Sequence, residues 1–94
     1  MSYEFVDSTI NAWVAKHALS LFSDPGRSVY LSSDDGECCQ IWIDLPDSNR
    51  VHLHAAAVEA RENEEMRIDW DVPMAELSHA LENAVTSVRQ WFTR

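Results

Sequence analysis

Two histidines, His52 and His54, have the residue type and spacing closest to chemistry in this chain. On a β-strand they would project from one face with α-carbons about 7 Å apart, a usable spacing for two metal ligands. Cys38, Asp44 or Asp69 would supply a third ligand. Because no second spaced pair supports them, we predict no metal and no cofactor, and a His-centred metal site or enzyme is the weakest of three hypotheses.

Motifs for covalent or phosphate chemistry do not occur in the sequence. It has no G-x-S-x-G elbow, no H-E-x-x-H pair and no P-loop, and its two glycines leave little backbone for close approach to a ligand. Cys38 and Cys39 are adjacent, so on a strand they would leave opposite faces and remain free thiols. His17, on the apolar side of a helix, is expected to be a hydrogen-bonded core histidine. We therefore predict no catalytic residue and no enzyme.

Four strands would position these residues. They are expected at residues 27–32, 37–45, 50–57 and 66–72, where apolar and polar side chains alternate. Strands buried on both faces read as continuous apolar runs, so alternation indicates an antiparallel sheet with one solvated face. In the first strand, the turn after it leaves open whether Val29 with Leu31 or Tyr30 faces the core.

Two amphipathic helices flank the strands. The first is expected over residues 7–24, with Asp7, Ser8 or Thr9 as its cap and Pro25 as its stop, and Phe22 in its apolar stripe. The last is expected to open at Pro73. The predicted fold is a single α+β domain over residues 1–94, a four-stranded antiparallel meander with both helices packed on one face.

The solvated face of this sheet is the predicted partner surface, because large amphipathic side chains anchor interfaces. The shortest connection through Pro46 that preserves the faces pairs Trp42 with His52. The alternative is that the stems of long arginine side chains shield the tryptophan. The face is expected to carry Trp42, His52, His54 and Asp69, with Gln40, Asp44 and Arg67 beside them and Arg50 as the other shielding arginine.

Charge gives a second indication. Sixteen acidic against seven basic residues give a net charge of -9, which argues against direct binding of nucleic acid and favours a basic protein partner. The densest negative segment contains Glu62, Glu64 and Glu65, which we include in the predicted partner-binding site. The alternative is that the acidity serves only solubility.

The compartment is predicted to be the cytoplasm. The first twenty residues carry charged side chains instead of the apolar run of a signal peptide, and no stretch approaches the roughly 18 apolar residues of a membrane span. We expect no membrane association.

The leading hypothesis is a small acidic protein-binding module, of the kind found in inhibitors and immunity proteins that mask a basic partner. The second is a homodimeric scaffold protein. The order of helix, strand meander and helix resembles the acidic type III secretion chaperones, although the chain lacks room for that family's usual extra helix and strand. This resemblance implies a homodimer.

Overall fold

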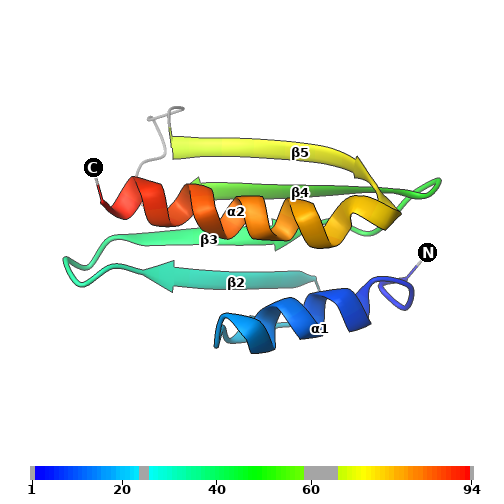
Figure 1. The fold of residues 1–94 in the computed structure, drawn as a ribbon, viewed down its shortest axis with the longest axis horizontal. Coiled ribbons are helices and arrows are strands. Elements are labelled where there is room, and N and C mark those ends of the chain that lie inside the picture. The colour runs from blue at the N-terminus through cyan, green and yellow to red at the C-terminus, as the bar shows by residue number, and fades with distance from the viewer. Residues whose placement is uncertain (1, 24–25, 59–65, 94) are drawn as a thin grey trace.

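The computed structural model describes residues 2–23, 26–58 and 66–93. Within these residues, two helices and five strands follow one another (Figure 1). A 3-10 turn, η2, connects the last strand to the last helix. The elements are α1 (Asp7–Lys16), β1 (Leu21–Phe22), β2 (Arg27–Ser32), β3 (Cys38–Ile43), β4 (Arg50–Ala57), β5 (Arg67–Pro73), η2 (Met74–Glu76) and α2 (Leu77–Phe92).

The strands form one antiparallel sheet in the order β1-β2-β3-β4-β5. Both helices lie against the same face of this sheet, with α2 over its middle and α1 beside β2 (Figure 1). The predicted α+β class and the placement of both helices on one face are confirmed. The predicted number of strands is one too small.

The additional strand exists because α1 ends at Lys16, whereas a helix to residue 24 was expected. The backbone N–H of Leu19 donates to the carbonyl of Val14 at 2.9 Å, and that of Ala18 to Ala15 at 3.3 Å. Ala18 takes a left-handed φ of 53°. This is the hydrogen-bond pattern of a Schellman C-cap, which normally uses glycine. The chain then continues as β1, which pairs with β2.

The N-terminus of α1 is held by a backbone segment and not by a side-chain cap. Tyr3 accepts hydrogen bonds from the backbone N–H groups of Val6 and Asp7, at 2.9 and 2.8 Å. No described side chain caps the helix, so the expected capping role of Asp7, Ser8 or Thr9 is wrong. Asp7 instead pairs with Arg27 at the start of β2.

The core lies between the helices and the inner face of the sheet. Val29 and Leu31 are buried and Tyr30 is exposed, so of the two alternatives for β2, the one with Val29 and Leu31 facing the core is correct. The inward faces predicted for the next two strands are confirmed within β3 and β4, whereas Leu45, which was also expected to face inward, lies beyond β3 and is exposed. Buried side chains from the sheet are Val29, Leu31, Cys39, Ile41, Ile43, Val51, Leu53 and Ala55, and those from the helices include Ile10, Trp13, Leu77, Leu81, Val85 and Val88.

The register between β3 and β4 differs from the predicted one by two residues. Trp42 lies opposite His54, and Gln40 opposite Ala56. The chain reverses in a tight turn in which Ser48 and Asn49 have φ values of 53° and 66°. Arg50 N–H donates to the carbonyl of Asp47 across this turn at 2.9 Å.

The shift also needs one extra residue on the β3 side. Asp44 N–H donates to the carbonyl of His52, and Asp47 bridges Arg50. Leu45 and Pro46 therefore both lie opposite the single residue 51, which is the arrangement of a β-bulge. Because side chains alternate with period two, a shift of two residues leaves the paired side chains of β3 and β4 on their predicted faces. Leu45, in the bulge itself, is exposed instead of facing inward.

The two helices contact each other through a polar cluster. His17 is largely buried, and its Nε2 lies 2.9 Å from Oε2 of Glu82 on α2. Lys16 adds a hydrogen bond to the same carboxylate at 3.0 Å. The expectation that His17 is hydrogen-bonded is confirmed, but it lies at the contact between the two helices and not in the core. No helix in the described ranges is long and apolar enough to cross a membrane.

Candidate protein-binding face

The outer face is the side of the sheet opposite the helices. Strand pairing arranges its side chains in rows that cross the strands. The first row is Phe22, Ser28, Trp42, His54 and Asp69; the second is Tyr30, Gln40, Ala56 and Arg67; the third is Asp44, His52 and Asp71. We call the part on β1 to β3 that carries Phe22, Tyr30 and Trp42 the aromatic half, and the part that carries Asp44 and the β4 and β5 side chains the charged half.

Trp42 joins the two halves. Its ring stacks on His54 with centroids 4.9 Å apart and planes inclined by 22°. In the neighbouring row, the small side chain of Ala56 lies between Arg67 and Gln40. The guanidinium of Arg67 lies 5.5 Å from the centre of the Trp42 ring. Such cation–π contact orders the ring and covers part of it. Trp42 is half-buried, with the guanidinium of Arg67 near its ring. The alternative that arginines shield Trp42 therefore applies in part to Arg67, whereas Arg50 donates to Asp71 instead.

His54 is held between two carboxylates. Its Nδ1 lies 2.5 Å from Oδ1 of Asp69, and its Nε2 lies 2.8 Å from Oδ2 of Asp44. Only 16% of the side chain is exposed. Burial by itself lowers the pKa of His54, but the hydrogen bonds to Asp69 and Asp44, together with their charges, outweigh burial and raise the pKa above its ordinary value.

Asp71 binds a second group of basic side chains at the edge of the charged half. Arg50 Nε donates to Oδ1 of Asp71 at 2.8 Å, and His52 Nε2 lies 3.3 Å from the same oxygen. The hydrogen bond from Arg50, followed by the charges of Arg50 and His52, holds the pKa of Asp71 below its usual range. His52 is therefore an exposed neighbour of the His54 cluster and not part of it.

The described charges of this half are nearly balanced. Its three carboxylates meet two arginines and the ring of His54, whose raised pKa favours the charged form. Electrostatic attraction for a basic partner must therefore arise outside the charged half. Asp34, Asp35 and Glu37 are exposed in the turn between β2 and β3 and form an acidic end of the sheet.

The aromatic half contains two residues that sequence reasoning missed. Phe22 and Tyr30 are 56% and 43% exposed, and their rings meet edge to face with centroids 5.6 Å apart. Phe22 was assigned to the apolar stripe of the first helix, which is wrong because α1 ends six residues earlier. The sequence signal is weak, since an alanine in the left-handed conformation at residue 18 looks like an ordinary helix residue.

Of the predicted site residues, Trp42, His52, His54 and Asp69 lie together on the outer face. Glu62, Glu64 and Glu65 lie outside the described residues. The chain leaves the described part after Val58, whose N–H donates to the carbonyl of Cys38, and returns at Met66.

Metal-binding chemistry finds no support in the described residues, where no three His, Cys, Asp or Glu side chains are placed to hold an ion. Both ring nitrogens of His54 already contact carboxylates. Cys38 and Cys39 are free and point to opposite faces, as predicted. Cys39 is buried on the core side, and burial, followed by the negative charges of Cys38 and Glu37, raises its pKa to about 11.

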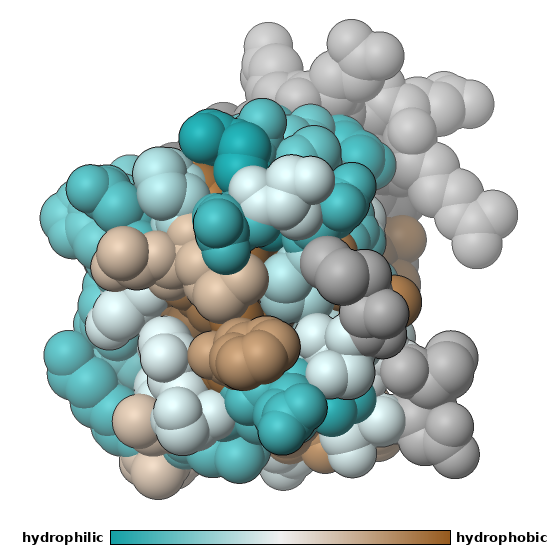
Figure 2. Space-filling view, turned by 90° about the vertical axis from the view of Figure 1, so that its right-hand side faces the viewer, coloured by the Kyte–Doolittle hydropathy of each residue, from teal (hydrophilic) through white to brown (hydrophobic). Residues whose placement is uncertain are grey.

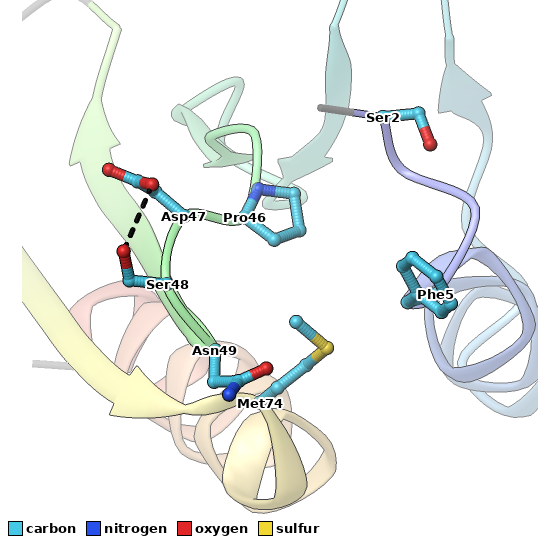
Figure 3. A pocket seen from close by; sticks show the side chains of 7 residues that line it. All are labelled: Ser2, Phe5, Pro46, Asp47, Ser48, Asn49 and Met74. Atoms are coloured by element: carbon cyan, nitrogen blue, oxygen red, sulfur yellow. Dashed lines mark hydrogen bonds between the residues drawn. The ribbon is translucent and has the colours of Figure 1, made fainter.

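A separate apolar patch lies at the end of the molecule that carries the N-terminal segment (Figure 2). It borders an open hollow of about 540 Å³ between the start of α1, the β3–β4 connection and η2 (Figure 3). Phe5, which is 76% exposed, forms one wall, and Met74 points toward it from the other side (Figure 3). This hollow does not reach the outer face.

Comparison with known protein families, curated proteins and solved structures gives no match for this chain. The fold and the site together define its class as an acidic α+β domain with helices on one face of the sheet and an aromatic and charged outer face.

Proposed function

We propose that this chain is a protein-binding module that docks a basic protein partner on its outer face. The observation that carries the proposal is the pair of exposed aromatic side chains, Phe22 and Tyr30, beside the ordered ring of Trp42 on a face that no described helix covers.

The aromatic half suits an interface anchor. Tyrosine, tryptophan and phenylalanine are enriched at interfaces and lose little conformational entropy on binding. Phe22 and Tyr30 already contact each other edge to face, and Trp42 is held by His54 and Arg67. A partner would therefore meet side chains whose rotamers are largely fixed, which lowers the cost of association.

The charge of this chain indicates that its partner is positively charged. The chain carries a net charge of -9, and its charged half is internally neutralised. The carboxylates that have no basic partner among the described residues include Asp34, Asp35 and Glu37 at the end of the sheet. A negative field raises the association rate of a positively charged partner more than it raises the affinity. An inhibitor or immunity-type protein that masks a basic partner is the form of this function that we favour.

The test is a quantitative pull-down from the native cell with three baits. These are the wild-type chain, the outer-face variant Phe22→Ser/Tyr30→Ser and the matched control Phe5→Ser, which removes an exposed aromatic ring at the separate hollow. A basic protein should be retained by the wild type and the control. Its recovery should fall at least about tenfold with the outer-face variant, because truncating interface anchors costs about 2 kcal/mol or more.

Salt supplies the second readout. Raising the salt concentration from about 0.1 M to about 1 M shortens the Debye length from about 10 Å to about 3 Å and should slow association of the retained protein. Equal recovery by all three baits, loss with Phe5→Ser alone, or retention of acidic proteins only would overturn the proposal. Circular dichroism of each bait shows that the comparison is made between folded proteins.

A homodimer is the second candidate, favoured by the edge formed by β5. This strand has seven residues, ends the sheet in the described structure, and leaves Ile68 and Trp70 only half-buried. If two copies paired antiparallel about Asp69, Arg67 would lie opposite Asp71 of the second copy and Ile68 opposite Trp70 of the second copy. Opposite charges would then face each other, and apolar side chains would face apolar ones. The exception is the two-fold axis, where Asp69 would face Asp69 of the second copy.

Light scattering over a hundredfold range of protein concentration tests this candidate. A dimer mass that Arg67→Asp reduces to a monomer mass supports pairing through β5, because the change places two aspartates opposite each other. A monomer mass at every concentration, or a dimer that Arg67→Asp leaves intact, would eliminate it.

A further inference from the structure

His54 lies where three strands of the outer face are tied together. It projects from β4, contacts Asp69 on β5 and Asp44 just after β3, and stacks on Trp42 of β3. The two carboxylates approach opposite nitrogens of the same ring. Each contact, at 2.5 and 2.8 Å, is at or below the usual length of a charge-assisted hydrogen bond.

This arrangement requires a proton on each nitrogen. A neutral imidazole has one N–H and one lone pair, whereas the imidazolium donates from both nitrogens. Removal of one proton would place a nitrogen lone pair against a carboxylate oxygen. One of the two carboxylates must then move away, and the contact between neighbouring strands through His54 is lost.

We propose that His54 is a pH-dependent clamp of the outer face, closed when its ring is protonated and opened when the ring loses its proton. The open state releases Asp44 or Asp69 and loosens the stacked Trp42. The clamp itself follows from the geometry of the cluster, and its role in regulating partner binding rests on the proposed function.

The surrounding charges determine the pH at which His54 loses its proton and the clamp opens. The groups that face His54 are Asp44 after β3, Asp69 and Arg67 on β5, and, one position further along the face, His52 with Asp71. Arg67 donates to Asp69 at 3.1 Å and so competes with His54 for this carboxylate. Trp42 from β3 and Ser28 from β2, which complete the row, carry no charge.

The direction of the response follows from linkage. The pKa of His54 in the folded protein is raised above its ordinary value of 6.5. A raised histidine pKa contributes stability that is fully present below the unfolded value and is lost as the pH rises through the folded value. The clamp is therefore closed at low pH and opens as the pH rises through the folded pKa of His54.

Nuclear magnetic resonance of the protein alone tests the clamp. Between about pH 5.5 and about pH 9, the ring signal of His54 and the indole N–H signal of Trp42 should move with one shared midpoint above 6.5. Asp44→Asn removes one charged acceptor and should lower this midpoint by about one unit. The matched control His52→Gln, which changes the exposed neighbour, should leave it in place.

A His54→Gln variant should abolish the response of Trp42 to pH. If this variant does not fold, the wild-type titration and the Asp44→Asn shift still decide the question. A His54 midpoint at or below 6.5, or a Trp42 signal that stays fixed while His54 titrates, would overturn the clamp. No partner enters these measurements, so failure of every bait to retain a basic protein would remove the proposed function and leave the clamp standing.

Discussion

His54 stacks on Trp42 across β4 and β3, with ring centroids 4.9 Å apart. The shortest hairpin would have placed His52 in this position. Both histidines lie on the same face, so the alternation of side chains cannot distinguish them, and the bulge at Leu45 and Pro46 decides which one meets the tryptophan. The choice matters because His54 has two carboxylate partners, whereas His52 has one.

Ala18→Gly is expected to raise the free energy of unfolding by about 1 kcal/mol. Ala18 occupies the left-handed position of the Schellman cap, which costs an L-residue about 1 to 2 kcal/mol and glycine almost nothing. Part of this gain is offset by the greater freedom of glycine in the unfolded chain. Urea denaturation followed by tryptophan fluorescence measures the difference.

The matched control for that change is Ala12→Gly in the exposed middle of α1. There glycine has only its entropic cost, so the free energy of unfolding should fall by about 0.5 to 1 kcal/mol. Destabilisation of similar size by both substitutions would contradict the capping role of Ala18.

Asp7→Asn is expected to lower the free energy of unfolding at pH 7 by about 1 kcal/mol. Arg27 Nε and Nη2 donate to the two oxygens of Asp7 at 2.8 and 3.1 Å. The hydrogen bond from Arg27, with its charge, holds the pKa of Asp7 below its ordinary value of 3.8 against a smaller effect of burial.

The effect of Asp7 should depend on pH. A lowered carboxyl pKa contributes stability that is present above the unfolded value and is lost as the pH falls through the folded value. Denaturation curves of the wild type and Asp7→Asn should therefore converge as the pH falls below 3.8. Asp35→Asn in the exposed turn serves as the control, and a pH-independent gap between wild type and Asp7→Asn would contradict the ion pair.

Cys38 and Cys39 should differ sharply in reactivity although they are adjacent. Cys39 is 1% exposed, and burial raises its pKa to about 11, so few thiolates form at neutral pH. Under native conditions at pH 8, mass spectrometry after iodoacetamide should find one label on Cys39→Ala and none on Cys38→Ala. In urea each variant should take one label; prompt native labelling of Cys38→Ala would contradict the packing of β3.

Trp13→Phe is expected to change the free energy of unfolding by less than about 1 kcal/mol. The indole N–H of Trp13 is buried without a hydrogen-bond partner among the described residues. Removing an unsatisfied donor recovers about 1 to 3 kcal/mol, which offsets the lost packing volume. Trp13→Ala should cost about 3 to 5 kcal/mol in the same urea experiment. Equal losses of unfolding free energy in both variants would show that the unpaired N–H of Trp13 does not destabilise the fold.

Periodicity in the sequence determined much of this protein. The alternation from Cys38 to Ile43 and from Arg50 to Ala57 fixed which side chains are buried, because a strand presents successive residues to opposite faces. The same alternation placed Trp42, His52, His54 and Asp69 on one face, and the pattern of α2 fixed its buried side.

The tertiary structure decided the end of α1, the register between β3 and β4 and the surroundings of His54, which the periodicity of the sequence does not determine. The end of α1 depends on a left-handed backbone at Ala18, and alanine is not a residue type that predicts this conformation. Because α1 ends there, Phe22 lies in β1 on the outer face and not in the core. The pairing of Trp42 with His54 depends on a bulge that preserves the faces and changes only the register. The carboxylates around His54 come from β5 and from the residue that follows β3, so they are close to His54 only once the sheet has formed.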